Sequence, residues 1–570
     1  MKTPFQTTAR VLLSAFVALS LSGCRPFGAE SPTARVDSLF ASWNGKDSPG
    51  CAVGISRNGA VLYEHGYGMA NLELGVPITT DTVFALASIT KSFTAMSIML
   101  AVQQGKLSLD DEVQKYIPEW ADRDDHIAIR HLLSHTSGLR DAFGLLGWAD
   151  PSESVDLQNE TIVRILARQH GLNVPPGTEY QYNNGGYALL ASILKRATGQ
   201  SLREFADANI FKPLGMTHTH VHDDLPMLVP NRASGYSRNE SDWRAAKEDG
   251  GVVGNGGMYS TVGDLLRWEE NFANPRVGTR EMFATMEKPI ALSGGETSPY
   301  GFGFGSQQYR GQRVIGHNGG DYGIATNVTR YPDQRFAVTV LCNIDQISMG
   351  GTTTTDPEAL ANRVADVYLA DVLAPVEVAT NATSASTVVK LSDADLVDKV
   401  GLYRSARGER PLLFTVHDGT LMVRSYSGDD VDLELTPLGA NRFMLLERVP
   451  FEFMPAAAGR PKQWLVGQGK QQNVFQPIML ALSETELRGF AGAYRSEELG
   501  TTYTLEARDA TLVVKSSRPD VTITVFSKDV FVGDWVGVVK FSRDSRGAVS
   551  SFTVNRDNAR GVRFDRIPTH

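Results

Sequence analysis

The chain has 570 residues, which is too long for one hydrophobic core and predicts about three or four domains. Hydrophobic residues make up 42% of the sequence and charged residues 21%, which is ordinary for globular protein and excludes a largely disordered chain. The formal net charge is -9 and no cluster of Lys and Arg stands out, so nucleic-acid binding is not expected.

The N-terminus has the pattern of an export signal. Basic residues precede an apolar run over residues 11–21, which is too short for a stable membrane-spanning helix. The run ends in Leu-Ser-Gly before Cys24, which resembles the bacterial lipoprotein signal, cleaved before a cysteine that is then acylated. We expect a signal peptide at 1–23, a tether at 24–34 and lipidation of Cys24. The protein would then be an exported, membrane-anchored lipoprotein that faces the periplasm or the cell exterior; an ordinary cleaved signal peptide is the alternative.

Residues 35–373 alternate between helix and strand patterns. After a short helix pattern, two strand patterns over 51–65 are joined by Asn-Gly, which is typical of a hairpin. The segment from 88 to about 275 is mainly helical, strand patterns return from about 300 to 343, and a helix is predicted at 357–369. This order predicts a sheet covered by helices, with a helical insert.

The C-terminal part of the chain contains an internal repeat. Residues 374–390 have few large apolar side chains and are predicted to be a linker. The following motif, which begins at Leu391 and continues as Gly-Leu-Tyr-Arg-Ser, recurs 91 residues later as Gly-Ala-Tyr-Arg-Ser. Later pairs are 88 residues apart, which a single three-residue deletion explains. A repeat of this length is a small domain, and its alternating patterns predict two antiparallel β-barrels, 391–480 and 481–570.

The chemistry begins at Ser88-Ile89-Thr90-Lys91, the start of a predicted amphipathic helix that ends near Gly105. Residues i and i+3 lie on one helix face, so the Lys91 amine can reach the Ser88 hydroxyl. A serine becomes a strong nucleophile when a neighbouring base takes its proton, and a helix N-terminus favours developing negative charge. A four-residue match carries little weight alone, and a capped helix with a surface lysine is the alternative.

Two further motifs supply what acyl transfer requires. Tyr182-Asn183-Asn184 opens a predicted helix, and His317-Asn318-Gly319 lies on a strand edge. We expect Lys91 and Tyr182 to handle protons together, since a nearby ammonium lowers a tyrosine pKa from its usual value of about 10. Asn184 is expected to hold the substrate amide and the lysine.

The small residues Gly319 and Gly320 let a strand backbone approach the substrate. A backbone N–H group at this point, together with that of Ser88, can form an oxyanion hole.

The three motifs, in this order, resemble those of the serine β-lactamase and penicillin-binding-protein family, on the branch with Tyr-x-Asn and His-x-Gly. The resemblance spans roughly 35–372 and includes the segments 130–139, 213–216 and 256–265. With two similar barrels following, the whole chain resembles the D-aminopeptidases of this family, of the class C-like, peptidase S12 type. It implies an α+β fold: a β-lactamase/transpeptidase-like catalytic domain, with an antiparallel sheet flanked by helices plus a helical insert, followed by two antiparallel β-barrels.

The same resemblance assigns roles to residues. It implies that Ser88 forms the acyl-enzyme, that Tyr182 with Lys91 acts as general base and then acid, and that the N–H groups of Ser88 and Gly320 form the oxyanion hole. No metal and no organic cofactor are implied. A loop of the last barrel is expected to reach the catalytic cleft, with Asp534 or Trp535 in contact with the substrate.

The cysteines other than Cys24 are Cys51 and Cys342, both in strand patterns. An oxidising compartment allows a disulfide, while two buried free thiols are the default. The resemblance implies that the first and last strands of the sheet pair, so the two cysteines are expected to lie close together, with a disulfide less favoured than free thiols.

The third motif departs from the family pattern, because His317 and Asn318 stand where a lysine and a hydroxyl residue would bind a substrate carboxylate. A neutral histidine attracts a carboxylate only weakly. This disfavours β-lactams and peptide C-termini and favours D-aminopeptidase, amidase or esterase substrates. Asp321 follows directly and can meet a substrate ammonium group; a solvated turn aspartate is the alternative.

We therefore expect a serine hydrolase that cleaves a small peptide, amide or ester substrate, with D-amino-acid peptides first among the candidates. One alternative is a β-lactamase or D-Ala-D-Ala carboxypeptidase. Another is a penicillin-binding sensor or scaffold that is acylated at Ser88 without turnover. His131 and His135 have the i, i+4 spacing of metal ligands, but the glutamate of His-Glu-x-x-His is missing and structural roles are expected.

Overall fold

The computed structural model describes most of the chain after the N-terminal segment. The described residues are 30–120, 124–155, 157–239, 242–246, 251–345, 355–375, 391–405, 411–426, 432–445, 449–469, 472–509, 511–556 and 558–568. The predicted signal peptide, Cys24, most of the tether and most of the linker 374–390 lie outside these residues. No helix within the described ranges is long and apolar enough to cross a membrane.

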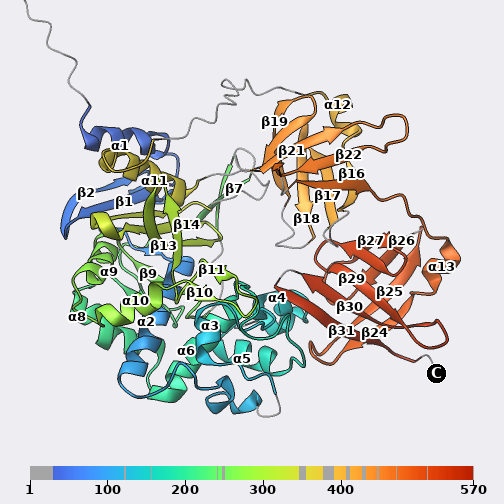
Figure 1. Ribbon diagram of the computed structural model, residues 1–570, viewed down its shortest axis with the longest axis horizontal. Helices are drawn as coiled ribbons and strands as arrows, with labels where there is room; N and C mark the ends of the chain where they lie inside the picture. Colours follow the sequence, from blue (N-terminus) through green and yellow to red (C-terminus); the bar gives the residue numbers. More distant parts are fainter. Residues whose placement is uncertain are drawn as a thin grey trace, which may run out of the picture.

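A six-stranded antiparallel sheet forms the centre of the first domain (Figure 1). Its strands, in spatial order, are β12 (Gly305–Tyr309), β13 (Gln312–Asp321), β14 (Ile324–Tyr331), β15 (Phe336–Cys342), β1 (Cys51–Arg57) and β2 (Ala60–Tyr67). The predicted hairpin between β1 and β2 is confirmed, with positive φ at both Asn58 and Gly59. All of β15 is buried, because helices cover both faces of the sheet.

Helices α1 (Pro32–Phe40) and α11 (Pro357–Tyr368) lie side by side on one face of the sheet (Figure 1). Ser31 caps α1, which therefore begins three residues before the predicted start of the domain. The other face carries α9 (Val262–Ala273), α10 (Arg280–Glu287) and α2 (Thr90–Gln103), and Phe93 of α2 stacks on Trp268 of α9.

The prediction of an amphipathic helix after Ser88 is wrong, because α2 is buried on all sides from Thr90 to Ala101. Its polar side chains bond inside the domain: Ser92 and Ser97 donate to carbonyl oxygens of the preceding turn, and Thr94 donates to the carbonyl of Gly254. The helix that carries Lys91 is thus the central helix of the domain.

The remaining elements of the first domain form the helical insert and short hairpins. The helices are α3 (Ile129–Leu133), α4 (Ala142–Leu146), α5 (Asn159–Ala167), α6 (Asn184–Thr198), α7 (Leu202–Ala206) and α8 (Lys212–Leu214). The short strands are β3 (Met69–Asn71), β4 (Val76–Pro77), β5 (Phe84–Ala85), β6 (His220–Val221), β7 (Tyr236–Asn239), β8 (Asp242–Ala245), β9 (Met258–Ser260), β10 (Ile290–Ala291) and β11 (Thr297–Ser298). As predicted, α6 ends at a left-handed Gly199.

Two closed eight-stranded antiparallel barrels follow, as the repeat predicts (Figure 1). The first comprises α12 (Asp393–Val397), β16 (Gly401–Ser405), β17 (Pro411–His417), β18 (Thr420–Ser425), β19 (Leu433–Gly439), β20 (Arg442–Leu445), β21 (Val449–Met454), β22 (Gln463–Val466) and β23 (Asn473–Pro477). The second comprises α13 (Glu484–Arg488), β24 (Gly492–Ser496), β25 (Thr501–Arg508), β26 (Thr511–Lys515), β27 (Val521–Ser527), β28 (Val530–Gly533), β29 (Gly537–Arg543), β30 (Val549–Arg556) and β31 (Ala559–Arg566). Equivalent aromatic residues fill both cores, for example Trp464 and Phe552.

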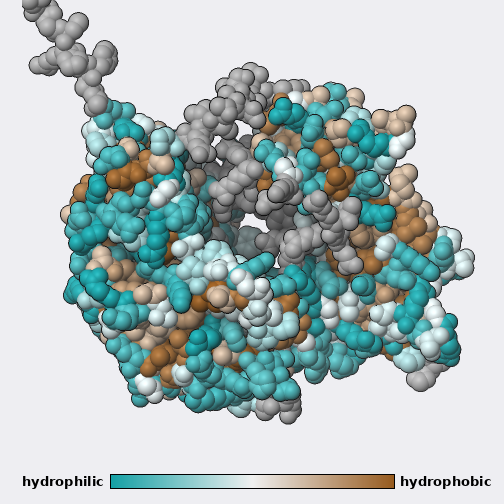
Figure 2. Space-filling view, in the orientation of Figure 1, coloured by the Kyte–Doolittle hydropathy of each residue, from teal (hydrophilic) through white to brown (hydrophobic). Residues whose placement is uncertain are grey.

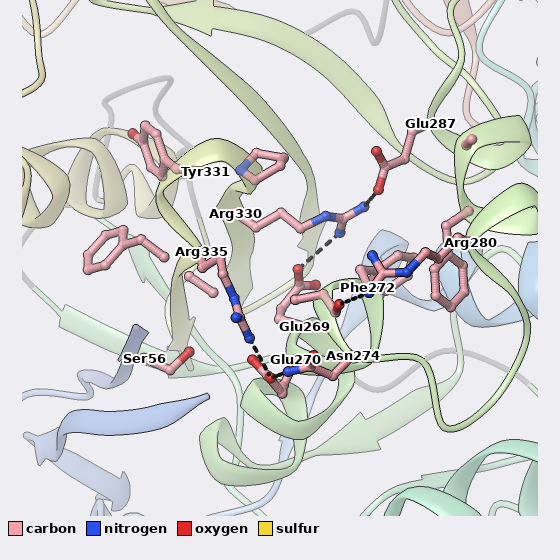
Figure 3. A pocket seen from close by; sticks show the side chains of 16 residues that line it. Ser56, Glu269, Glu270, Phe272, Asn274, Arg280, Glu287, Arg330, Tyr331 and Arg335 are labelled. Carbon is pink, nitrogen blue, oxygen red and sulfur yellow. Dashed lines mark hydrogen bonds and ion pairs between the residues drawn. The ribbon is translucent and has the colours of Figure 1, made fainter. Parts of the chain in front are cut away.

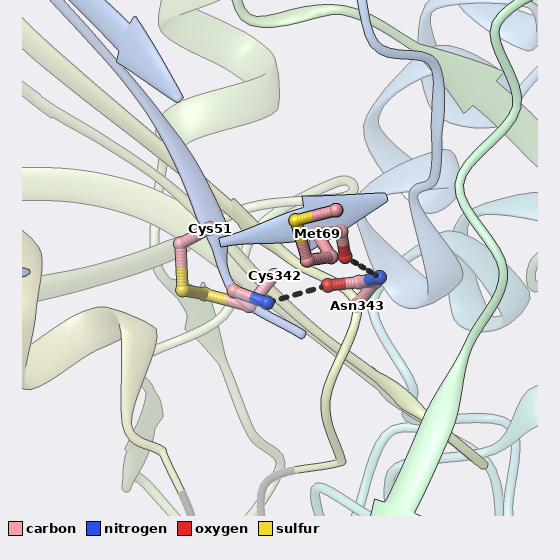
Figure 4. The surroundings of a disulfide bond; sticks show 5 residues. Cys51, Met69, Cys342 and Asn343 are labelled. Atoms are coloured by element: carbon pink, nitrogen blue, oxygen red, sulfur yellow. Dashed lines mark hydrogen bonds between the residues drawn. A yellow bond between two sulfur atoms is a disulfide. The ribbon is translucent and has the colours of Figure 1, made fainter. Parts of the chain in front are cut away.

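Cys51 and Cys342 face each other across β1 and β15 and form a disulfide (Figure 4). The expected proximity is confirmed, while the preference for free thiols is wrong. The two Cα atoms are 4.0 Å apart, which is the short spacing of a non-hydrogen-bonded pair in an antiparallel ladder. The sequence placed both residues on paired strands but could not give the register that puts them opposite each other.

A buried ion pair fixes the helices at the other end of the sheet (Figure 3). Arg330, near the end of β14, lies 3.0 Å from Glu269 of α9 and 2.6 Å from Glu287 of α10. Its guanidinium lies 3.9 Å from the centre of the Phe272 ring. These residues line a cavity of about 460 Å³ at the end of β14 away from the β13–β14 turn.

The second barrel packs directly on the helical insert, and the first barrel packs on the second. Buried side chains of the insert and of the second barrel form one continuous hydrophobic core. A smaller apolar cluster, which includes Tyr426 and Phe526, joins the two barrels. Figure 2 shows a hollow on this face of the molecule, between the first domain and the two barrels.

Candidate active site

Ser88 lies in a 3₁₀ turn, η2 (Ala87–Ile89), that leads directly into α2. In such a turn residues i and i+3 eclipse each other, so Lys91 lies over Ser88. The turn is tight, and Ala87 has a φ of 47°, in the left-handed region that non-glycine residues rarely adopt. Surrounding hydrogen bonds maintain this conformation, among them that from Thr326 Oγ1 to the Leu86 carbonyl at 2.9 Å.

The amine of Lys91 is buried and has three defined neighbours. Its Nζ atom lies 3.0 Å from Ser88 Oγ, 2.8 Å from Asn184 Oδ1 and 2.7 Å from the carbonyl oxygen of Asn255. The last two atoms only accept hydrogen bonds. A neutral amine therefore donates both N–H groups to Asn184 and Asn255 and directs its lone pair at the Ser88 hydroxyl.

Burial lowers the pKa of Lys91 to about 7, while the carboxylates of Asp141 and Asp321 oppose this shift. A substantial fraction of Lys91 is therefore neutral at physiological pH and able to take the Ser88 proton.

Tyr182 lies beside this pair, with Lys91 Nζ 4.8 Å from the centre of its ring. Burial raises the pKa of Tyr182 above its usual value, and a hydrogen bond with Ser88 opposes this only in part. The expectation that Lys91 lowers the pKa of Tyr182 is therefore wrong. Desolvation disfavours tyrosinate and ammonium alike, so Tyr182 stays protonated while Lys91 loses its charge.

His135 holds the second motif in place. Its Nδ1 accepts a hydrogen bond from the Asn183 N–H at 3.0 Å, and its carbonyl oxygen accepts one from the Gln181 N–H at 2.8 Å. The imidazole packs against the Tyr182 ring at 4.4 Å between centres. Burial lowers the pKa of His135, so it is a neutral structural residue, as expected, but one that touches the site.

Asp141 anchors the start of α6, which carries Asn184 as its first residue. The buried carboxylate accepts hydrogen bonds from the N–H groups of Gly185 at 2.9 Å and Phe143 at 3.0 Å. Burial raises the pKa of Asp141, and these N–H donors oppose the shift. Asp141 thus links the second motif to α4.

The third motif lies on β13, against the turn that carries Ser88. A side chain at Gly319 would collide with the Leu86 carbonyl oxygen, 2.3 Å from a Cβ atom built there, so only glycine fits. A Cβ atom at Gly320 would meet open space, so this backbone borders the cleft. The oxyanion hole formed by the Ser88 and Gly320 N–H groups stays a prediction.

His317 and Asn318 are engaged by neighbouring side chains. The His317 Nδ1 is 2.6 Å from the Asn318 carbonyl, to which it must donate, so Nε2 accepts from the Tyr300 hydroxyl at 2.8 Å. Burial and the nearby Lys91 lower the pKa of His317 to about 3. Asn318 donates to Glu358 at 2.6 Å and accepts from Asn327. Neither residue has a charge to offer a carboxylate.

Two cavities adjoin these residues. One, of about 310 Å³, is lined by Ala87, Asn255, Gly256 and Asp321 among others. The other, of about 290 Å³, is lined by Tyr182 and His317 and extends to Glu358. Asp321 therefore lies in a cavity next to the Ser88 turn, where a substrate can reach it.

Some expected contacts are absent or different. Trp535 does not point to the cleft: its ring donates to the Pro519 carbonyl, and its own carbonyl accepts from Trp148 Nε1 at 3.2 Å. Asp534 pairs with Arg424 of the first barrel. Within the described part of the chain, no group of three His, Cys, Asp or Glu side chains is arranged to hold a metal ion.

The sequence model of the Beta-lactamase family matches residues 36–368 of this chain. The chain belongs to the β-lactamase family. Penicillin-binding protein 4* of Bacillus subtilis (strain 168) is 31% identical over 329 residues, which cover 55% of this chain and 72% of the relative. D-aminopeptidase of Brucella anthropi is 25% identical over 544 residues, which cover 91% of this chain and 95% of the relative, so that match extends over both barrels.

The octameric penicillin-binding protein homologue from Pyrococcus abyssi has a similar structure, with a TM-score of 0.54 and 22% identity over 78% of this chain and 99% of that chain. This likeness supports the fold. The protein is a serine hydrolase of the β-lactamase family, with an α+β domain followed by two β-barrels.

Several residues that contact the site were not predicted to do so from the sequence. They are His135, Asp141, Asn255, Tyr300 and Glu358. His135 lies in the segment 130–139 that resembles the family, which was a usable signal. The Asn255 carbonyl and Glu358 had none, because a backbone acceptor and a helix glutamate acquire a role only through tertiary contacts.

Proposed function

We propose that this serine hydrolase releases a D-amino acid from the N-terminus of a small peptide or amide. One observation carries its acyl-transfer chemistry: the Lys91 amine, with a pKa of about 7, lies 3.0 Å from Ser88 Oγ and is held by two acceptors. The D-aminopeptidase relative, which aligns over almost the whole chain, supports the substrate class.

The reaction follows from this geometry. Lys91 takes the Ser88 proton as Oγ forms a bond to the substrate carbonyl carbon. The Lys91–Tyr182 pair returns a proton to the leaving nitrogen as the C–N bond breaks, which leaves an ester on Ser88. Water then attacks the ester, the same pair takes its proton, and Ser88 Oγ recovers a proton as the acid is released.

Asp321 supports recognition of a free amino group. Its carboxylate lines the cavity beside the Ser88 turn, close enough to oppose in part the lowering of the Lys91 pKa by burial. A substrate ammonium bound there would form a charge-assisted hydrogen bond.

The test is turnover of D-alanine p-nitroanilide and its L-isomer, with Ser88→Ala as control and intact mass as a second readout. We expect repeated product release from the D-isomer, lost in Ser88→Ala. A stable adduct on Ser88 without turnover would indicate a sensor instead, and faster turnover of the L-isomer would refute the stereochemical assignment.

We also propose that the chain is exported and anchored by lipid on Cys24. The sequence around Cys24 supports the anchor, and the Cys51–Cys342 disulfide suits an oxidising compartment. Radiolabelled palmitate should label the wild type and not Cys24→Ser; equal labelling of both proteins would exclude the anchor at this residue.

A further inference from the structure

The cavity between Tyr182, His317 and Glu358 adjoins the residue that can protonate a leaving group. The acid that protonates the leaving nitrogen must be within hydrogen-bond reach of it. Tyr182 belongs to the proton-transfer pair and lines this cavity, whereas Asp321 lines the other cavity. Resting on the proposed function, this arrangement places the acyl group towards Asp321 and the leaving group towards Glu358.

The described lining of the leaving-group cavity carries one formal charge, and it is negative. Glu358 and His317 are the only Asp, Glu, Lys, Arg or His side chains of that lining. His317 is neutral, with a pKa of about 3. The described wall of the cavity therefore presents no cation to an entering carboxylate.

Glu358 is fixed in its position by contacts on both oxygens. Oε1 accepts from Gln307 Nε2 at 2.7 Å and Oε2 accepts from Asn318 Nδ2 at 2.6 Å. It also lies in the first turn of α11, where the helix dipole stabilises a negative charge. The side chain is therefore an oriented carboxylate in the wall of the cavity.

We infer that this cavity selects a leaving group without negative charge, and that Glu358 is the residue that enforces the selection. The leaving groups that this cavity accepts are ammonia, a neutral amine, a cationic amine or an amino-acid residue whose carboxylate is blocked. A dipeptide with a free C-terminal carboxylate is disfavoured, because two carboxylates repel each other in a partly desolvated cavity. The enzyme is thus an amidase in preference to a dipeptidase.

The experiment compares D-alanyl-glycine with D-alanyl-glycinamide, which differ only in the charge of the leaving residue. For the wild type we expect kcat/KM for D-alanyl-glycinamide to exceed that for D-alanyl-glycine by about tenfold or more, mainly because KM is lower for the amide. Glu358→Gln should reduce the ratio to about threefold or less by improving turnover of the dipeptide. Glu281→Gln, which removes a charge from the first turn of α10, is the matched control and should keep the wild-type ratio.

Circular dichroism reports whether Glu358→Gln is folded, and the rate of each variant on the two dipeptide substrates is divided by its own rate on D-alanine p-nitroanilide, whose leaving group is uncharged. Equal cleavage of both dipeptide substrates by the wild type, or an unchanged ratio in Glu358→Gln, would overturn the inference.

Failure of the proposed function would appear separately, as no turnover of any D-alanyl compound by the wild type. In that case acetyl esters of glycolate and glycolamide test the same charge discrimination without an amino-acid acyl group. A wild-type preference for the glycolamide ester that Glu358→Gln reduces would support the inference, and equal rates would refute it.

Discussion

At the scale of single residues, the site depends on burying a lysine without giving it an ionic partner in contact. The three atoms around the Lys91 amine are a hydroxyl, an amide oxygen and a peptide carbonyl. Burial therefore lowers its pKa towards neutrality, and Asp141 and Asp321 act only from a distance. The result is a base that is partly neutral at pH 7, next to a tyrosine that remains an acid.

The pH dependence of kcat/KM should follow from this assignment. Lys91 must be neutral to take the Ser88 proton, so activity should rise with pH through about 7 and then level off. Because burial raises the pKa of Tyr182, no loss of activity is expected up to about pH 9 with an acetyl ester substrate, which has no amino group of its own to titrate. Initial rates between pH 5 and 9 measure this profile, and an activity that falls above pH 7 would contradict it.

Lys91→Arg tests the same assignment, because a guanidinium stays charged at every accessible pH. We expect kcat to fall by a factor of about 10³ or more, with no recovery at pH 9. Circular dichroism should show that the variant is folded. Substantial activity in Lys91→Arg would exclude lysine as the base.

At the scale of secondary-structure elements, sequence patterns correctly predicted turns and helix ends, which depend on local contacts. The hairpin at Asn58-Gly59 and the end of α6 at Gly199 were predicted from turn and capping chemistry. The amphipathic assignment of α2 failed because its hydroxyl groups bond to nearby carbonyls, which allows a partly polar helix to be buried all round.

The sequence predicted that the three motifs form one site. It did not predict the disulfide between β1 and β15 or which of Lys91 and Tyr182 has the lower pKa. Strand register decides whether Cys51 meets Cys342, and desolvation decides the pKa order of Lys91 and Tyr182. Both depend on distant parts of the chain, which no local pattern records.

The Cys51–Cys342 disulfide joins the first and last strands of the sheet over a separation of 291 residues. Replacing both cysteines by alanine should lower the free energy of unfolding by about 2–5 kcal/mol, because the unfolded chain gains freedom. Urea unfolding of the oxidised, reduced and doubly substituted proteins measures the effect. The reduced wild type should have the same free energy of unfolding as the double variant. If the oxidised wild type were no more stable than the double variant, a structural role for the bond would be refuted.

At the scale of the whole molecule, the second barrel supports the segment that carries Asp141. Arg140, the preceding residue, forms a buried ion pair with Glu498 of the barrel at 2.6 Å and donates to the Arg560 carbonyl at 2.7 Å. The Asp141 N–H donates to the Asn558 carbonyl at 2.7 Å. The barrel therefore stabilises the loop whose carboxylate holds α6 and Asn184 in position.

Glu498→Gln should weaken this support. Leaving Arg140 buried without its carboxylate should cost about 3 kcal/mol of stability and reduce kcat, because α6 loses part of its anchor. The neighbouring Glu497→Gln is the control, since Glu497 pairs with Arg495 at the surface and should have no measurable effect. Thermal unfolding and steady-state kinetics measure both quantities. A stability loss with an unchanged kcat would show that the barrel stabilises the fold without positioning the site.

The covalent link between β1 and β15 also bears on the proposed export of the chain, because a disulfide persists in an oxidising space. Thiols stay reduced in a bacterial cytoplasm, so a newly made chain there lacks this link. It would be easier to keep unfolded for transport, and it would close its sheet permanently only after reaching an oxidising space. On the proposed export route, the bond that holds the sheet together would therefore form only after transport.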